Sequence, residues 1–221
     1  MEVEPLILQD KMTFEIVRII NEPISSNCYL LFNKNLNNHC IIVDPGSENA
    51  EIITSEIEKF KLVPQYIILT HEHFDHCWSC NDLIKQYNIP IICSENCREA
   101  IQSSRKNCSL YYNQTGFEIE AQTMSIESIE KRLFWNHCEF NFLLTQGHSN
   151  ASICFLVGNC LFTGDTLIQN EKTVTKLLSG SKEKLKQSIQ LINQFQGKGY
   201  TVYAGHGDQF ELDQYNTKLV F

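Results

Sequence analysis

The sequence predicts an α/β fold with a partly parallel sheet that carries helices on a face. Short apolar runs typical of strands alternate along the chain with segments whose apolar residues are spaced for one face of a helix. Polar residues follow the ends of several of these strands, which is where α/β sheets place their ligand sites. The 221 residues are 43% apolar and 20% charged, a globular composition. A chain of this length buries roughly 70–75% of its unfolded surface. We expect one domain spanning residues 1–221.

Apolar runs bounded by turn-forming residues predict the strands of the N-terminal half. They cover residues 14–20, 28–32, 40–43, 66–69 and 89–93. Segments rich in Asn, Pro and Ser separate the first three runs, as is typical of turns. Helices are expected at residues 48–60, 80–87 and 96–103. In the first of these helices, Ile53, Ile57 and Phe60 fall on one face.

The C-terminal half shows a similar pattern of strands followed by a helix. Strands are expected at residues 140–145, 152–157, 160–163 and 200–204, and a helix at 181–195. Residues 104–138 show no clear pattern, and we expect a solvated loop there. The alternative is a segment that lies over the functional site and contacts substrate, because long loops in compact domains tend to be functional.

A segment at residues 70–76 holds three of the seven histidines and an aspartate, directly after a strand that we expect to be buried. His71 and His73 project to the same side in an extended backbone, and Asp75 and His76 follow at once. Imidazole and carboxylate together suit Zn²⁺, Fe²⁺ or Mn²⁺, and four donors are too many for one open catalytic ion. Two neighbouring ions would use them all. The zinc-protease helix motif H-E-x-x-H does not fit, because Asp75 stands four residues after His71, and we expect a loop here.

Four further polar residues stand at strand ends beside turn-forming residues: Asp44, His148, Asp165 and His206. Each of them alone is more often an ordinary turn residue than a ligand. The recurrence of one arrangement argues for a shared site. Asp44 lies in an Asp-Pro-Gly turn, and its alternative role is to orient metal ligands through a hydrogen bond.

Charge and composition argue against several classes of partner. The formal net charge of −8 argues against nucleic acid. Residues 1–12 begin with acidic residues and hold only a short apolar run, so we expect no secretory signal, and no stretch is long enough to span a membrane. We expect the ten cysteines to stay reduced in the cytoplasm. Cys77 and Cys80 form a lone C-x-x-C, for which a redox or metal role is the less favoured alternative.

The ordered motifs resemble those of the metallo-β-lactamase superfamily, and most closely those of glyoxalase II-type hydrolases (hydroxyacylglutathione hydrolase-like proteins). The blocks are Val43-Asp44-Pro45-Gly46, Thr70-His71-Glu72-His73-Phe74-Asp75-His76, Gly147-His148-Ser149, Thr163-Gly164-Asp165 and Gly205-His206-Gly207. The resemblance implies a four-layer αββα sandwich with the metal site at the edge of the two sheets. It also implies a first ion held by His71, His73 and His148, a second held by Asp75, His76 and His206, and Asp165 as the bridge.

The resemblance further implies hydrolysis of a small thioester, ester or lactone by a hydroxide that bridges two divalent transition-metal ions. Zn is the expected metal, with Fe or Mn as alternatives. Asp75 and Asp165 would then be catalytic as well as metal-binding. Neutral imidazoles with only two carboxylates leave such a site net positive, which favours a small anionic substrate. We expect no nucleic-acid or membrane partner.

Two departures from the family pattern bear on the substrate. Glyoxalase II carries a C-terminal helical domain that binds glutathione, whereas only 15 residues follow His206 here. Residues 174–181 resemble the family's Arg-Thr-Asp-Leu-Pro-Gly-Gly stretch with both charges lost and Lys176 gained. An iron-dependent persulfide dioxygenase, whose motifs are similar, is therefore an alternative, and a non-catalytic relative of the fold is another. Lys176, Arg105 and Tyr112 are expected to contact the substrate.

Overall fold

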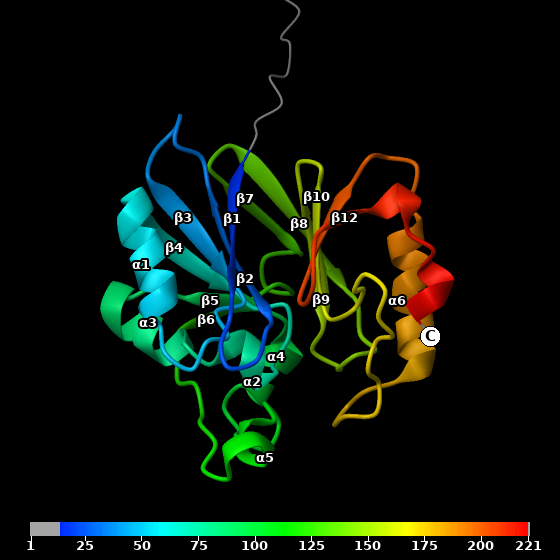
Figure 1. Ribbon diagram of the computed structural model, residues 1–221, viewed down its shortest axis with the longest axis horizontal. Coiled ribbons are helices and arrows are strands. Elements are labelled where there is room, and N and C mark those ends of the chain that lie inside the picture. Colours follow the sequence, from blue (N-terminus) through cyan, green and yellow to red (C-terminus); the bar gives the residue numbers. More distant parts are fainter. Residues whose placement is uncertain (1–13, 221) are drawn as a thin grey trace, which may run out of the picture.

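The computed structural model describes residues 14–220, so the segment in which we expect no export signal lies outside the described residues. Two six-stranded sheets pack face to face, and helices cover the outer face of each (Figure 1). The first sheet contains, in spatial order, β1 (Glu15–Ile20), β2 (Asn27–Phe32), β3 (His39–Val43), β4 (Val63–Ile68), β5 (Ile91–Cys93) and β6 (Thr123–Ser125). The second contains β12 (Phe210–Glu211), β11 (Thr201–Ala204), β10 (Cys160–Gly164), β9 (Ile153–Val157), β8 (Cys138–Leu144) and β7 (Arg132–Trp135).

The longer helices form the two outer layers, which confirms the predicted αββα sandwich. The first sheet is covered by α1 (Glu51–Phe60), α3 (Cys80–Tyr87) and α4 (Glu95–Ala100), and the second by α6 (Lys182–Asn193). The shorter elements are α2 (Phe74–Cys77), α5 (Ser109–Asn113) and the 3₁₀ helices Leu212–Gln214 and Thr217–Val220. Within residues 14–220, none of the helices has the length and apolar character needed to cross a bilayer.

Three buried apolar clusters fill the three interfaces between these layers. In β2, Leu30 packs in a cluster with Ile53 of α1, whereas its neighbour Leu31 packs in a cluster with Phe155 of the second sheet. Successive strand side chains point to opposite faces, so a strand covered on both sides is apolar throughout. A third cluster packs Ile189 of α6 against the second sheet.

The strand order brings distant chain segments to one end of the sandwich. β3, β4 and β5 are parallel neighbours, and so are β10 and β11, so the carboxyl ends of each set lie together. Backbone hydrogen bonds join the two sets: the amide of Ile153 donates to the carbonyl of Thr70 at 2.8 Å, and that of Asn27 donates to Gly205 at 2.7 Å. The turns after β4, β10 and β11 therefore meet.

Two stretches differ from the sequence-based expectation. Residues 104–138 are not simply a loop, because they contain α5, β6 and β7. Each of these elements has three to five residues, too few to show a helical or alternating pattern. Residues 74–77 form the single helical turn α2, where we expected a loop, so only residues 70–73 of the 70–76 segment lie outside regular structure.

Candidate metal centre

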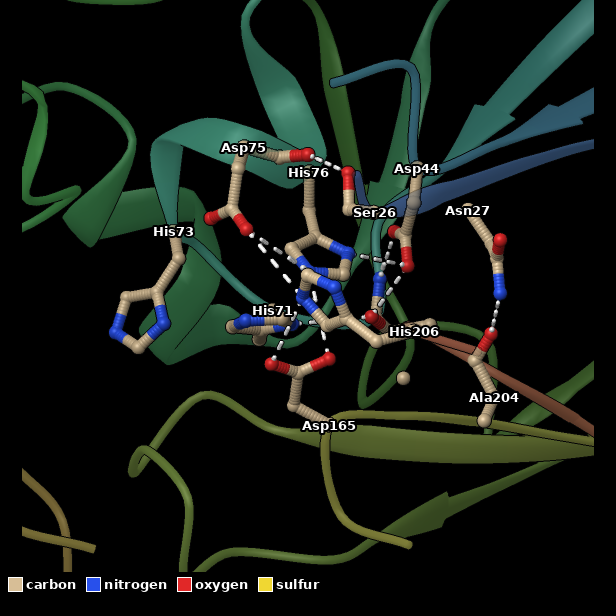
Figure 2. Close-up of polar contacts among 12 residues, drawn as sticks. Ser26, Asn27, Asp44, His71, His73, Asp75, His76, Asp165, Ala204 and His206 are labelled. Carbon is tan, nitrogen blue, oxygen red and sulfur yellow. Dashed lines mark hydrogen bonds and ion pairs between the residues drawn. The ribbon is translucent and has the colours of Figure 1, made fainter. Parts of the chain in front are cut away.

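Seven side chains with metal-ligating chemistry converge where β4, β10 and β11 end (Figure 2). His71 and His73 lie in the turn after β4, and Asp75 and His76 lie on α2. His148 lies between β8 and β9, Asp165 follows β10, and His206 follows β11. The structure thus brings together every metal-site residue that the sequence predicted.

Two glycines allow the turns to approach this closely. A Cβ atom added at Gly205 would lie 2.1 Å from Oδ1 of Asp165 and 2.8 Å from Cε1 of His76. A Cβ atom added at Gly46 would lie 1.6 Å from the carbonyl oxygen of Asp75. Any side chain at either position would push ligands apart, so both glycines are part of how the centre is built.

The side chains form three overlapping groups, and the ligand atoms of each group lie within 4.8 Å of one another. The groups are His71 with His73 and His148, Asp75 with His76 and His206, and His71 with His76 and Asp165. Asp165 faces both of the first two groups: its Oδ1 lies 3.4 Å from Nε2 of His76, and its Oδ2 lies 3.7 Å from Nε2 of His148 and 3.5 Å from Nε2 of His206. This is the arrangement expected of a carboxylate shared by two cations.

Unsatisfied buried atoms show whether these residues fit a metal. Nε2 of His71, His73 and His76 and Oδ1 of Asp165 are buried and have no hydrogen-bond partner among the described residues. Leaving a buried polar atom unpaired costs about 1–3 kcal/mol, and four such atoms cluster here. Cations would satisfy the atoms of His71, His76 and Asp165, whereas His73 faces His148 with its other ring nitrogen, Nδ1. Imidazole and carboxylate are also a donor set that suits divalent transition metals.

Hydrogen bonds to Asp44 orient the ligands on the first sheet. Its Oδ1 accepts from the amide of Thr70 at 2.8 Å, and its Oδ2 accepts from the Thr70 hydroxyl at 2.6 Å and lies 3.1 Å from Nδ1 of His76. The Thr70 oxygen lies in turn 3.1 Å from Nδ1 of His71. Both rings can donate from Nδ1, which leaves the Nε2 lone pair for a metal. Asp44 therefore orients ligands, the alternative role considered for it from the sequence.

The other side of the centre uses backbone acceptors in the same way. Nδ1 of His148 donates to the carbonyl of Val174 at 2.9 Å, and Nδ1 of His206 donates to that of Ser25 at 3.2 Å. Nε2 of each ring again points into the cluster. Nδ1 of His73 lies only 2.9 Å from Nε2 of His148, so two ring nitrogens converge on one point.

Burial and neighbouring charges put most of these groups in the protonation state of a metal ligand. Burial lowers the pKa of His71 and His148, and lowers that of His73 to about 3, so these rings are neutral at pH 7. Burial alone would raise the pKa of Asp165, but the nearby His76, His148 and His206 together outweigh it and hold the pKa well below its usual range. In reverse, Asp165 and Asp75 outweigh burial and raise the pKa of His76. The carboxylates of Asp75 and Asp165 thus favour a positively charged group, such as a cation, in the space between them.

No pattern in the sequence indicated which residues hold His206 against the first sheet. Asn27 donates from Nδ2 to the carbonyls of Ala204 at 3.0 Å and Gly207 at 2.8 Å, one on each side of His206. Its neighbour Ser26 donates to the backbone carbonyl of Asp75 (Figure 2). Adjacent residues at the start of β2 therefore hold turns that belong to different sheets.

The remaining residues singled out from the sequence are not among the seven candidate ligands. Cys77 is buried, donates to the carbonyl of Glu72 at 3.3 Å, and has its pKa raised by burial, so it behaves as a packed thiol. Tyr112 packs its ring 4.8 Å from that of Phe74, beside the centre. The side chain of Arg105 makes no ion pair or hydrogen bond within residues 14–220.

Comparisons with known proteins agree with this geometry. The family model described as the Metallo-beta-lactamase superfamily matches residues 21–206, a span that contains all seven candidate ligands. The chain is 29% identical to the probable metallo-hydrolase YqgX of Bacillus subtilis, over 86% of this chain and 89% of that protein. It is 26% identical to a hydroxyacylglutathione hydrolase of Pectobacterium carotovorum, over 80% of this chain but only 61% of that protein. The crystal structure of BLEG-1, a B3 metallo-beta-lactamase, superposes with a TM-score of 0.83 at 26% identity, covering 94% of this chain and all of that one. The protein therefore belongs to the metallo-beta-lactamase superfamily.

Proposed function

We propose that the protein is a dinuclear metallohydrolase that attacks the carbonyl carbon of a small thioester, ester or lactone and cleaves its acyl C–S or C–O bond. The observation that carries the proposal is that Asp165 lies between the two outer groups of ligands. Buried ligand atoms without a hydrogen-bond partner within residues 14–220, Nε2 of His71 and His76 and Oδ1 of Asp165, lie in the same centre. Membership of the superfamily and the likeness to a probable metallo-hydrolase support it.

The three groups of side chains suggest which residues hold each of the two ions. His71, His73 and His148 would hold one ion, Asp75, His76 and His206 the other, and Asp165 would contact both. Two divalent ions, which we propose to be Zn²⁺ with Fe²⁺ or Mn²⁺ as alternatives, lower the pKa of water towards neutrality and polarise a carbonyl oxygen.

The protein's own residues fix the ligands before substrate arrives. Donation from Nδ1 of His76 to Asp44 and from Nδ1 of His148 to Val174 locks both ring orientations. Asp165 is ionised and 11% exposed, so its carboxylate is held ready without bulk water around it. Preorganised ligands of this kind need little rearrangement during the reaction. Asp75 and Asp165 are the carboxylates that we propose to be catalytic.

The likeness to a glyoxalase II-type protein suggests which acyl compound is the substrate. A glyoxalase II-like thioesterase activity is supported by the 26% identity to a hydroxyacylglutathione hydrolase, although the chain spans only about three fifths of that protein. We propose a small anionic molecule as substrate, and no nucleic acid or membrane as partner. A cytoplasmic location fits ten cysteines that all carry free thiols.

A hydrolysis panel tests the proposal. Purified protein is offered thioesters, lactones, β-lactams and phosphodiesters, and His73→Ala and Asp165→Ala serve as inactive controls. We expect turnover of at least one acyl substrate, lost in both variants while circular dichroism shows them folded. Activity that survives in both folded variants would refute the assignment of these residues.

An iron-dependent persulfide dioxygenase is the second candidate function. One of the three groups, His71 with His76 and Asp165, has the two-histidine, one-carboxylate composition of non-haem iron oxygenases. Oxygen uptake with glutathione persulfide, together with a single iron ion per chain, would favour this activity. Two ions per chain and no oxygen uptake would favour the hydrolase.

A further inference from the structure

A cavity of about 590 Å³ lies between the segment that follows β10 and the first half of α6. Ligand sites for small molecules usually have volumes of about 300–1,000 Å³, so a sizeable organic group fits. The inner wall is tied to the metal centre, because the carbonyl of Val174 accepts from Nδ1 of His148 at 2.9 Å. Thr173, also in the lining, donates from its hydroxyl to the carbonyl of Thr166, the residue after Asp165, at 3.1 Å.

The lining is strongly basic although the whole chain carries a formal charge of −8. Its charged members are Lys172, Lys176, Lys182, Lys186 and Glu183. No carboxylate within residues 14–220 forms an ion pair with any of the four ammonium groups. The carboxylate of Glu183 accepts instead from the hydroxyl of Ser181 at 3.2 Å. The lining therefore carries a net positive charge, with four ammonium groups against one carboxylate.

The spacing and type of these cations indicate what they would bind. Lys182 and Lys186 are four residues apart on α6 and so share a face, where like charges destabilise a helix unless an anion lies between them. All four cations are lysines, with no arginine in the lining. Lysine binds phosphate as a point charge, and several such charges in one cavity suit a ligand that carries several negative charges.

We infer that this cavity binds a phosphate-type polyanion, and that the polyanion is the distal part of a molecule whose acyl group reaches the metal centre. The shared wall at Val174 places the two regions next to each other. The assignment of the polyanion to the substrate rests on the proposed hydrolase function, but binding of the polyanion does not. A free phosphate-type anion would satisfy the same lysines, and the experiment separates the two sources.

The first arm measures binding of inorganic pyrophosphate to the purified protein by calorimetry. The test variant is the double replacement Lys182→Ala with Lys186→Ala, and the matched control is Lys184→Ala, on the same helix but lining a different cavity. Removing two charges is expected to weaken binding about tenfold, against less than about twofold for the control. Equal affinities of wild type and double variant, or no binding by wild type, would overturn the inference.

The second arm identifies the source of the anion with two acetyl thioesters that share the same reacting bond. Acetyl-coenzyme A carries phosphates, and S-acetyl-N-acetylcysteamine carries none. If the polyanion belongs to the substrate, the double variant raises KM about tenfold for the first ester and leaves it unchanged for the second. Equal changes for both esters would overturn that assignment in favour of a free anion. Suppose that wild type hydrolyses neither ester, and that wild type binds pyrophosphate whereas the double variant does not. The hydrolase proposal then fails for thioesters, while the anion site stands.

Discussion

The start of β2 provides a quantitative test of how the second group of ligands is held. Asn27 is 1% exposed, and its Nδ2 donates to the carbonyls of Ala204 and Gly207 on either side of His206. The replacement Asn27→Ala removes both hydrogen bonds and leaves the seven ligands unchanged. It should therefore loosen His206 without touching the chemistry of the centre.

The magnitude follows from what remains bonded in the variant. The Tyr29 hydroxyl still donates to Ala204 at 2.7 Å, and Nη1 of Arg18 still donates to Gly207 at 2.8 Å. Neither carbonyl is left unsatisfied, so the loss is the net value of two hydrogen bonds, about 2 kcal/mol. If the whole of this free energy is lost from the binding of one ion, the affinity of the protein for that ion falls by about 30-fold. This is an upper limit, since part of the loss appears as reduced folding stability.

Chelator titration with detection of released metal measures the effect. The matched control is Asn33→Ala. Asn33 directly follows β2 at its other end and is also buried, and within residues 14–220 its side chain accepts only from the amide of Asn35, at 3.0 Å. We expect Asn27→Ala to release one ion at a lower chelator concentration and to keep the other, while Asn33→Ala follows wild type. Two ions weakened equally, or none weakened, would refute the reasoning that Asn27 positions His206.

Three further predictions concern charge, acidity and thiol chemistry. Asp165→Asn keeps the side-chain shape but removes the charge that faces both ligand groups. Circular dichroism should show the variant folded, and elemental analysis should find fewer bound ions than in wild type. Full metal content in the variant would contradict this. Burial lowers the pKa of His73 from 6.5 to about 3, so between those values the unfolded chain binds a proton that the folded, metal-free protein does not. Because of this residue, the free energy of unfolding falls by about 1.4 kcal/mol for each pH unit below 6.5. In urea titrations from pH 6.5 to 5.5, the free energy of unfolding should therefore decline less steeply for His73→Gln than for wild type. Burial also raises the pKa of Cys108 from 9.0 to about 11, so iodoacetamide should modify it at pH 8 about a hundred times more slowly than an unperturbed thiol; mass spectrometry showing rapid labelling would count against the packing described.

Several of the ligands could be predicted from the sequence because they stand close to where an apolar run stops. Asp165 directly follows β10, and His71 comes three residues after the end of β4. A strand end is visible in the chain itself, since burial on both faces makes the strand apolar and the next polar residue marks the turn. The grouping of the ligands around Asp165 was implied by the resemblance to the metallo-β-lactamase superfamily and not by the pattern of the chain itself.

The parts that could not be predicted depend on short elements or distant partners. The helical turn α2 has four residues, fewer than a helical period needs to become visible. Asn27 resembles any turn residue before a strand, and its partner Gly207 is 180 positions away. Ser26 likewise bonds to Asp75, 49 positions along the chain. Such contacts are set by the packing of the two sheets, which the local pattern does not encode.

Anomalous X-ray scattering from crystals, recorded at the absorption edge of the metal found in the purified protein, tests the central claim most directly. The account predicts two peaks, one about 2.0–2.2 Å from ligand atoms of His71, His73 and His148, and the other equally close to Asp75, His76 and His206. Asp165 should lie within the same distance of both. Crystals of protein purified without chelator that show no peak among these side chains, or peaks elsewhere, would contradict the account.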